Sequence, residues 1–172
     1  MFSREDSTKD KCIGLFGSCG VSEWRKSFIE VYTKRQIPFF NSKVGVDQWQ
    51  PELSIGESYH LANDRILLLA ITKEEYSLGS LCELGFILNT LRNDKTRFCV
   101  VLIEPFPYEE LKKDLRLYQE SIKQRRLVVE HIQRLHPNNL YLVHHLDEML
   151  DISLKLYQVI DILSTIPGFC LH

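Results

Sequence analysis

The segment 65–91, RILLLAITKEEYSLGSLCELGFILNTL, decides the fold of this 172-residue chain. It begins with the apolar run Ile66–Ile71, which is long enough for a strand buried on both faces. A polar loop over residues 72–77 follows, and apolar residues then recur at helical spacing. These positions are Leu81, Leu84, Ile87, Leu88 and Leu91. A strand, a loop and a helix in this order predict one unit of a parallel α/β sheet.

Glu83 is the residue of chemical interest in this segment. It is expected in the first turn of the helix, at the carboxyl end of the strand, where open α/β sheets bind their ligands. A structural role is also well defined, because Ser80 and Glu83 have the spacing of a capping box. Spacing alone favours that structural role. The case for a functional role depends on the rest of the chain.

The composition is that of an ordinary globular protein. Hydrophobic residues make up 44% and charged residues 26% of the chain, and the net charge is −2. Bulk electrostatics therefore favours neither a nucleic-acid nor a membrane partner. The length suits a single domain over residues 1–172, with residues 1–11 as a flexible polar arm. No signal peptide and no membrane-spanning run is recognisable, so we expect a soluble cytoplasmic protein.

The cysteines and histidines do not form a recognisable metal motif. The five cysteines are irregularly spaced and include no C-x-x-C pair, so neither a zinc site nor a disulfide framework is predicted. Reduced thiols fit an intracellular protein. His144 and His145 follow an expected strand, but neighbours on a strand point in opposite directions. The sequence therefore predicts no metal.

Four further apolar runs complete the set of strands, at residues 12–16, 37–40, 98–103 and 140–143. Pro38 suits an edge strand. Helices are expected from about Ser22, over about residues 55–63 and over about residues 146–165. Five strands alternating with helices predict an α/β fold, a single doubly wound five-stranded parallel sheet of flavodoxin-like or Rossmann-like order 2-1-3-4-5.

The segment 107–135 is long, highly charged and helical in pattern, as one helix or two broken ones. Its charge run indicates a solvated face, and its apolar stripe would pack on the sheet or on another subunit. The stripe consists of Leu111, Leu115, Tyr118, Ile122, Val129 and Ile132.

The predicted strand order places its switch point, and hence the expected ligand crevice, between the first and third strands. The first strand leads through Gly17-Ser18 into a helix N-terminus, an arrangement that can bind an anion but is neither a G-x-G-x-x-G motif nor a P-loop. A tight turn that needs small residues is an equally good explanation. Phe40 and Trp49 could stack on a base or simply cover the core. Glu57 and His60 share a helix face nearby.

In chain order, several motifs resemble the nucleoside 2-deoxyribosyltransferase-like proteins. They are Gly17-Ser18, Ser22-x-Trp24-Arg25, Phe40-Asn41, Trp49-x-Pro51-Glu52, Glu57, Ala62-Asn63-Asp64 and Leu78-Gly79-Ser80-Leu81-x-Glu83-Leu84-Gly85. The resemblance covers roughly residues 12–91. Its most specific part is the Gly-Ser-x-x-Glu-x-Gly element.

The resemblance implies an enzyme that cleaves or transfers the N-glycosidic bond of a nucleoside or nucleotide, with no cofactor. It implies Glu83 as the catalytic nucleophile and Asp64 as a catalytic residue that helps to hold the sugar or base. Asp64 and Glu57 are both open as the donor of a proton to the leaving base. The substrate-binding residues that it implies are Gly17, Ser18, Trp24, Asn41, Trp49, Glu57, Gly79 and Ser80. The family pattern and the helical stripe also suggest a homodimer or larger homo-oligomer.

Two departures from the family pattern affect the transfer step. The transferases have an aspartate before the Gly-Thr-x-x-Glu element, where residues 76–78 here are Tyr-Ser-Leu. Their C-terminal asparagine, contributed by a neighbouring subunit, has no clear match in this sequence, and Asn138 and Asn139 are only candidates for it. A hydrolase of nucleosides or 5′-monophosphates is therefore a variant of the same hypothesis. The alternatives are a non-catalytic nucleotide-binding or sensor domain and an NAD-cleaving glycosidase.

Overall fold

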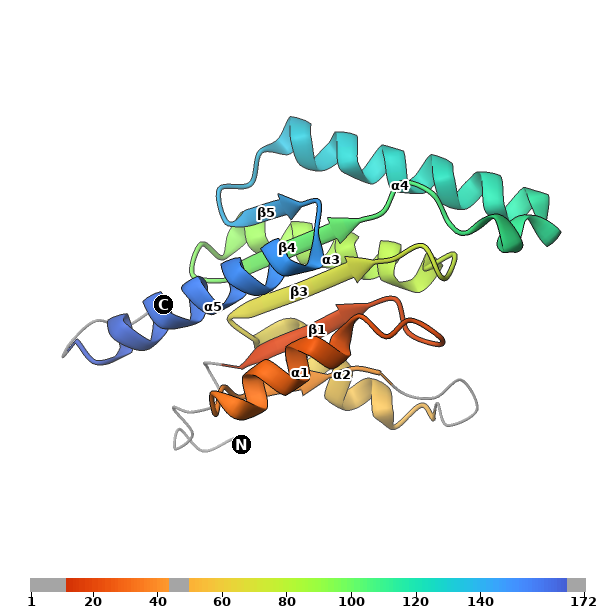
Figure 1. Ribbon diagram of the computed structural model, residues 1–172. Coiled ribbons are helices and arrows are strands. Elements are labelled where there is room, and N and C mark those ends of the chain that lie inside the picture. Colours follow the sequence, from red (N-terminus) through yellow and green to blue (C-terminus); the bar gives the residue numbers. More distant parts are fainter. Residues whose placement is uncertain (1–11, 44–49, 167–172) are drawn as a thin grey trace.

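The sheet in this computed structural model has five parallel strands in the order β2-β1-β3-β4-β5, which confirms the predicted fold class (Figure 1). The structure describes residues 12–43 and 50–166. The strands are β1 (Ile13–Gly17), β2 (Phe39–Asn41), β3 (Ile66–Ile71), β4 (Phe98–Ile103) and β5 (Leu140–Val143). The bounds of β3, β4 and β5 are those that the apolar runs predict. Strand β2 begins one residue after Pro38 and lies at the edge, as that proline indicates.

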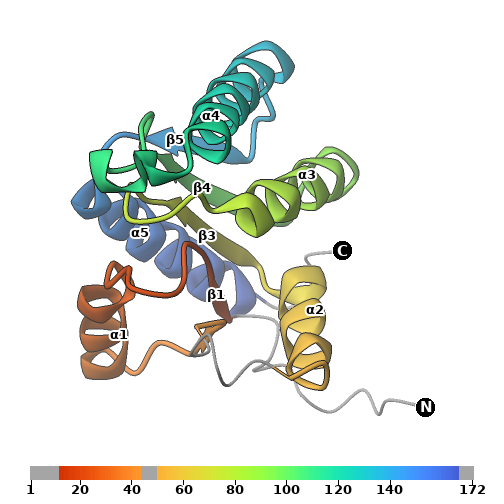
Figure 2. The ribbon, with the colours of Figure 1, turned by 90° about the vertical axis from the view of Figure 1, so that its right-hand side faces the viewer.

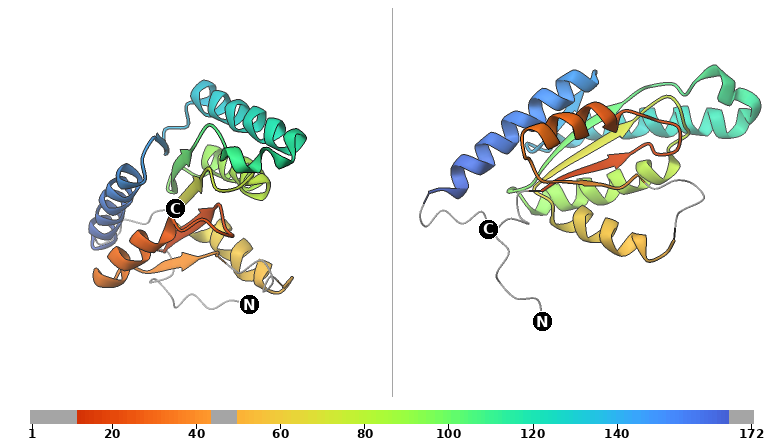
Figure 3. Two further views of the ribbon diagram at one scale, coloured as in Figure 1. Left: turned by 45° about the vertical axis from the view of Figure 1, so that its right-hand side comes forward. Right: turned by 60° about the horizontal axis from the view of Figure 1, so that its bottom comes forward.

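Helices cover both faces of the sheet (Figure 3). One face carries α1 (Arg25–Lys34) and α5 (Leu146–Ser164), and the other carries α2 (Leu53–Asn63), α3 (Leu78–Asn93) and α4 (Leu115–Leu135). Alternate residues of each strand face the two cores. In β3, Ile66 and Leu68 pack towards α1 and α5, whereas Leu67 and Leu69 pack towards α3. Every residue of β3 is buried as a result.

The start of α3 differs from the sequence-based expectation. The helix begins at Leu78, and its N-cap is Ser77, which has a left-handed backbone (φ 56°) and makes no side-chain capping bond. Ser80 is therefore inside the helix, and Glu83 lies in its second turn. The predicted Ser80–Glu83 capping box is wrong. Helix α1 also begins later than predicted, at Arg25, because Ser22 belongs to the preceding loop, where its hydroxyl bonds to that of Thr72.

The segment 107–135 forms two helices, a 3₁₀ helix (Glu109–Lys113) and α4. Asp114 separates them and caps α4 by accepting a hydrogen bond from the Leu117 amide. Within the predicted apolar stripe, Tyr118 and Ile132 are buried, but Leu115 is exposed.

Arg125 is a second correction to this segment, because it lies in the expected solvated charge run and is fully buried. Its guanidinium donates to the carbonyl oxygens of Thr72, Glu75 and Glu104, at 3.0, 2.6 and 2.6 Å. It therefore joins α4 to the loops that follow β3 and β4. Among the described residues, no helix is both long enough and apolar enough to cross a membrane.

Candidate active site at the carboxyl edge of the sheet

The loops that follow β1 and β3 meet at the carboxyl edge of the sheet, which faces the viewer in Figure 2. Gly17 makes their close approach possible. Its φ is +111°, and a Cβ at this position would lie 2.2 Å from the Ala70 carbonyl oxygen. The amide of Ser18 then donates to the same oxygen at 2.8 Å. Gly17 is therefore required by the contact between the two loops.

Ser18 and Trp24, two predicted substrate-binding residues, hold these loops together. The Ser18 hydroxyl accepts a hydrogen bond from the Thr72 amide at 2.9 Å and bonds to the Ser77 hydroxyl at 2.6 Å. The Trp24 indole N–H donates to the Ser18 carbonyl oxygen. Both side chains are buried, so the polar groups of both are used within the protein. The structure gives them a positioning role.

Arg25 supplies a buried positive charge beneath the β1 loop. Only 2% of its surface is exposed, and its guanidinium donates to the carbonyl oxygens of Leu15, Gly17 and Ser18. Burial lowers the pKa of Arg25, and the charges of Cys19, Glu83 and Glu75 oppose this shift. In the sequence, Arg25 is marked only as the last residue of the Ser22-x-Trp24-Arg25 motif. A lone arginine at a helix start gives no sign that it will be buried.

Two carboxylates from different helices share this positive charge. Glu83 of α3 is half-buried, and its pKa rises to about 7, mainly through burial and further through the negative charge of Glu57. Arg25 opposes that rise. Glu57 of α2 also has its pKa raised by burial and lowered by Arg25. A pair of carboxyl groups with raised pKa values in an α/β crevice is typical of a catalytic site.

A pocket of about 220 Å³ lies beside Glu57, the α2 member of this carboxylate pair. It is lined by Phe40, Asn41, Ser42, Glu52, Leu53, Gly56 and Glu57. Glu57 therefore belongs to both the pocket and the pair. One face of the Phe40 ring is stacked on His60, with 3.9 Å between ring centroids, which leaves less of Phe40 for a ligand. The Asn41 side chain accepts a hydrogen bond from the Lys43 amide. Trp49 lies outside the described residues.

Gly79 and Ser80 occupy the first turn of α3, one turn before Glu83. A Cβ at Gly79 would meet no atom within 4 Å, so the described structure leaves open space there. Ser80 is buried, with 8% of its surface exposed. These positions are close to Glu83 along the helix, as the resemblance implies, but only Gly79 faces open space.

The structure does not bring Asp64 to this site. Asp64 precedes β3 and so lies at the amino edge of the sheet, whereas Glu83 lies beyond its carboxyl edge. Six strand residues span about 20 Å. Asp64 is 1% exposed and accepts a hydrogen bond from His60 instead. Of the two candidate proton donors, only Glu57 is near Glu83, so the catalytic role that the resemblance implies for Asp64 does not fit the structure.

A larger hollow of about 450 Å³ lies on the α1 and α5 side of the same edge. Its walls include four acidic residues, Glu23, Glu74, Glu104 and Asp147, and one lysine, Lys73, together with His144 and His145. With the histidines neutral, this lining carries a net negative charge, which disfavours a phosphate. Neither Glu57 nor Glu83 contributes to its walls, so we assign the site to the smaller pocket.

No family model and no curated protein matches this sequence. Among solved structures, a chain in the crystal structure of the RPS4 and RRS1 TIR domain heterodimer is similar, with 9% sequence identity and a TM-score of 0.47. The match covers 84% of this chain and 99% of that chain. A similarity at this level leaves the function to be argued from the site.

Proposed function

We propose that the protein cleaves or transfers the N-glycosidic bond of a nucleoside or nucleotide, with Glu83 as the nucleophile. The observation that carries this proposal is the pair of Glu57 and Glu83 beside the buried Arg25. Glycosidic cleavage with a covalent intermediate needs two carboxyl groups, one to attack and one to move a proton. The pair also lies at the edge where ligands of this fold class bind.

In the proposed reaction, a carboxylate oxygen of Glu83 attacks the anomeric carbon of the sugar. The bond from this carbon to the base nitrogen breaks, and its electron pair leaves with the base. Glu57 gives a proton to the departing base. Water or a second base then attacks the anomeric carbon and releases the Glu83 carboxylate, which makes the enzyme a hydrolase or a transferase, respectively.

The charges around the pair set the protonation state that this division of roles requires. Burial raises the pKa of both carboxyl groups, and the negative charge of Glu57 adds to the rise of the Glu83 pKa to about 7. In the free protein Glu83 therefore holds a proton more strongly than Glu57 does. Cleavage uses the opposite state, in which Glu83 is ionised and Glu57 is protonated, so the proton has to pass from Glu83 to Glu57 before the attack. Arg25 supports the ionised state, since its positive charge lowers the pKa of Glu83. Proton transfer from Glu57 then restores a negative charge beside Arg25.

The pocket volume suits the base alone. At about 220 Å³ it is smaller than a typical pocket for a whole drug-sized ligand. Phe40 and Leu53 give it an apolar lining, and Asn41 and Glu57 give it polar groups that can read the edge of a base. In this arrangement the base enters the pocket past Glu57, and the sugar lies towards Glu83.

The test is a chromatographic screen of wild type and Glu83→Gln. Substrates are ribonucleosides, 2-deoxyribonucleosides, their 5′-monophosphates and NAD, each with and without a second free base. Glu130→Gln, an exposed substitution on α4, is the matched control. We expect wild type and the control to release free base, and Glu83→Gln to lose at least 100-fold in rate. Exchange with the added base identifies a transferase.

Two outcomes of this screen support the alternative functions. Turnover of NAD alone identifies an NAD-cleaving glycosidase. If no substrate turns over while a nucleotide raises the melting temperature of wild type, the protein is a nucleotide-binding or sensor domain, and the catalytic proposal is rejected.

A homo-oligomer stays a prediction. Helix α4 exposes several leucines, namely Leu115, Leu117, Leu127 and Leu135, which a second copy of the chain would cover. Small-angle scattering tests this prediction, and a monomer mass at micromolar concentration would remove its support.

A further inference from the structure

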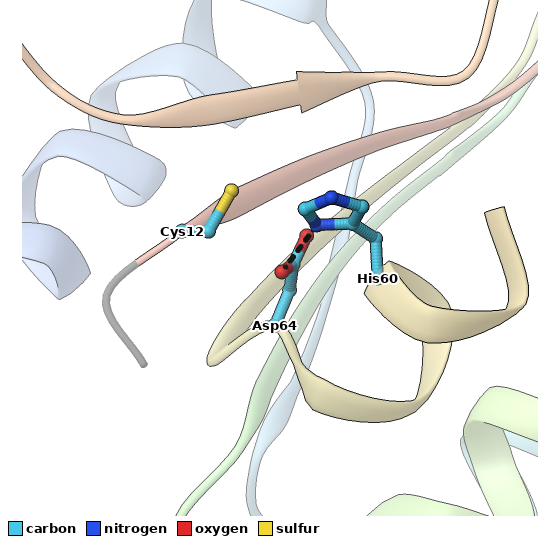
Figure 4. Close-up of side chains that lie close together, drawn as sticks. All are labelled: Cys12, His60 and Asp64. Atoms are coloured by element: carbon cyan, nitrogen blue, oxygen red, sulfur yellow. Dashed lines mark hydrogen bonds and ion pairs between the residues drawn. The ribbon is translucent and has the colours of Figure 1, made fainter. Parts of the chain in front are cut away.

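Three potential metal ligands meet at the amino edge of the sheet, opposite the site of Glu83 (Figure 4). Cys12 directly precedes β1, His60 lies in the last turn of α2, and Asp64 is the residue after that helix. One donor atom from each residue lies within 4.8 Å of the others. The fold therefore brings together a thiol, an imidazole and a carboxylate from two separate parts of the chain.

The Asp64 carboxylate has one unsatisfied oxygen. Its Oδ1 atom is 2.9 Å from His60 Nδ1, whereas its buried Oδ2 atom has no hydrogen-bond partner among the described residues. Asp64 is only 1% exposed. A buried carboxylate oxygen without a partner is costly, and in native proteins it commonly marks a missing water or ion.

The backbone of β1 leaves space for this carboxylate next to Cys12. A Cβ at Gly14 would lie 2.7 Å from Asp64 Oδ2. Cys12 and Gly14 are two residues apart along an extended segment, so the Cys12 side chain points to the same face of the sheet as a Cβ at Gly14 would. The Cys12 sulfur and an Asp64 carboxylate oxygen therefore lie on the same side of β1, within 4.8 Å of one another, with room for a cation to contact both.

The His60 ring is held in position by its neighbours. It stacks on Phe40 at an interplanar angle of 9° and meets the Tyr59 ring edge-on. Its side chain keeps 26% of its surface exposed, which gives an ion a route to the otherwise buried cluster. A fixed ring orientation reduces the conformational entropy lost when a ligand binds.

We propose that Cys12, His60 and Asp64 form a zinc-binding site that has three protein ligands and a water molecule in the fourth position. Thiolate, imidazole and carboxylate are the ligand types that zinc takes in proteins. With bonds of about 2.0–2.3 Å, tetrahedral zinc places its ligand atoms roughly 3.4 Å apart. Small side-chain movements achieve this spacing from the observed cluster. The zinc ion gives Asp64 Oδ2 a coordination bond and replaces the proton that lies between His60 Nδ1 and Asp64.

The simpler explanation is an ion pair between His60 and Asp64 at the end of α2. That pair accounts for Oδ1, and the Cys12 thiol also interacts with the Asp64 carboxylate, but buried Oδ2 is left without a geometrically satisfactory hydrogen-bond partner among the described residues. Arg97 is a positive charge near this cluster, and it lowers the pKa of Asp64. Its Nε and Nη2 atoms donate to the carbonyl oxygens of Asp64 and Leu61, whereas its buried Nη1 atom has no hydrogen-bond partner among the described residues. The thiolate and the carboxylate together balance the two positive charges of zinc, so Arg97 is not needed as a counter-ion.

Cobalt is the probe for this site, because tetrahedral Co²⁺ bound to a thiolate absorbs light in the visible and near-ultraviolet ranges. The reduced, chelator-treated protein is titrated with Co²⁺ and then with Zn²⁺. We expect one equivalent of Co²⁺ to produce a thiolate-to-cobalt charge-transfer band, and Zn²⁺ to remove it. Cys12→Ala should abolish the band, and His60→Ala should weaken Co²⁺ binding by at least tenfold.

Cys82→Ala and His131→Ala are matched controls, because both residues are exposed and lie on other helices. Both controls should bind Co²⁺ as the wild type does. Circular dichroism checks that each variant is folded, and His60→Ala decides the question if Cys12→Ala does not fold. The proposal is overturned if wild type shows no charge-transfer band, or if a folded Cys12→Ala variant still shows the band. It is also overturned if His60→Ala binds Co²⁺ as tightly as wild type does.

Discussion

The negative charge of Glu57, on α2, adds to burial in raising the pKa of Glu83, on α3, to about 7. The two helices bring the carboxyl groups together from positions 26 residues apart in the chain. Arg25, fixed by backbone carbonyls, is the nearby positive charge that opposes this rise. The electrostatic environment of Glu83 therefore depends on three elements at one edge of the sheet.

Glu83 is expected to make the folded protein less stable above neutral pH. Its pKa is about 7 in the folded protein against an ordinary value of 4.5, so folding disfavours the ionised form. The stability that the neutral form retains at low pH is lost as the pH rises from about 4.5 through about 7. The free energy of unfolding of Glu83→Gln should therefore exceed that of wild type by roughly 1–2 kcal/mol at pH 8, after allowance for solvent screening.

Urea denaturation at pH 5 and pH 8 measures this difference. The stabilisation by Glu83→Gln should be much smaller at pH 5 than at pH 8, because at pH 5 Glu83 of the folded wild type is mostly protonated. An equal gain at both pH values would show that the effect does not come from ionisation.

Glu57→Gln should distinguish the two catalytic roles through the leaving group. A neutral base needs a proton as it leaves, whereas a base that already carries a positive charge, as in 7-methylguanosine, does not. We expect Glu57→Gln to lose roughly 100-fold or more in rate on neutral nucleosides and much less on the cationic ones. Glu83→Gln should lose activity on both. Free base is measured by chromatography, and equal losses for Glu57→Gln on both substrates would contradict its role as the acid.

Gly17→Ala should destabilise the protein by about 2 kcal/mol or more. The new Cβ would lie 2.2 Å from a backbone oxygen of β3, and the residue would have to adopt a φ of +111°. Chemical denaturation measures the loss. Gly79→Ala is the matched control, because its Cβ would meet no atom within 4 Å, and it should be neutral or slightly stabilising within the helix. Similar losses for both variants would contradict the argument from the close approach.

Arg125→Met should destabilise the protein by about 3–5 kcal/mol. The substitution leaves the carbonyl oxygens of Thr72, Glu75 and Glu104 without their donor in a buried place. Arg126→Met, at an exposed position one residue further along α4, should change the free energy of unfolding by less than about 1 kcal/mol. Urea denaturation of both variants tests the prediction. A small effect of Arg125→Met would show that the loops do not depend on this side chain.

Much of the fold could be predicted because it follows from apolar runs. Strands such as β3 and β4 are buried on both faces, so their bounds are visible as unbroken apolar segments. The start of α3 was harder to predict, since the Ser80–Glu83 spacing has the form of a capping box. The observed cap instead depends on a left-handed Ser77, which a sequence pattern does not reveal.

The candidate site could be predicted in part. Glu83, Gly17 and Glu57 follow from the position of the crevice and from the resemblance. Asp64 was placed there by the resemblance alone, although a residue that precedes a strand in a parallel sheet lies at the opposite edge from one that follows it. The buried Arg25 and Arg125 were missed, because their hydrogen-bond partners are carbonyl groups of other segments, and no pattern of residue types marks them.

The most direct test of the central claim is mass spectrometry of Glu83 during turnover. The protein is incubated with a nucleoside that it cleaves, quenched with acid and digested. The account predicts a peptide that carries a pentosyl or 2-deoxypentosyl ester on Glu83, which disappears when water or a second base is allowed to react. Base release with no sugar on Glu83, or with the sugar on another residue, would contradict it.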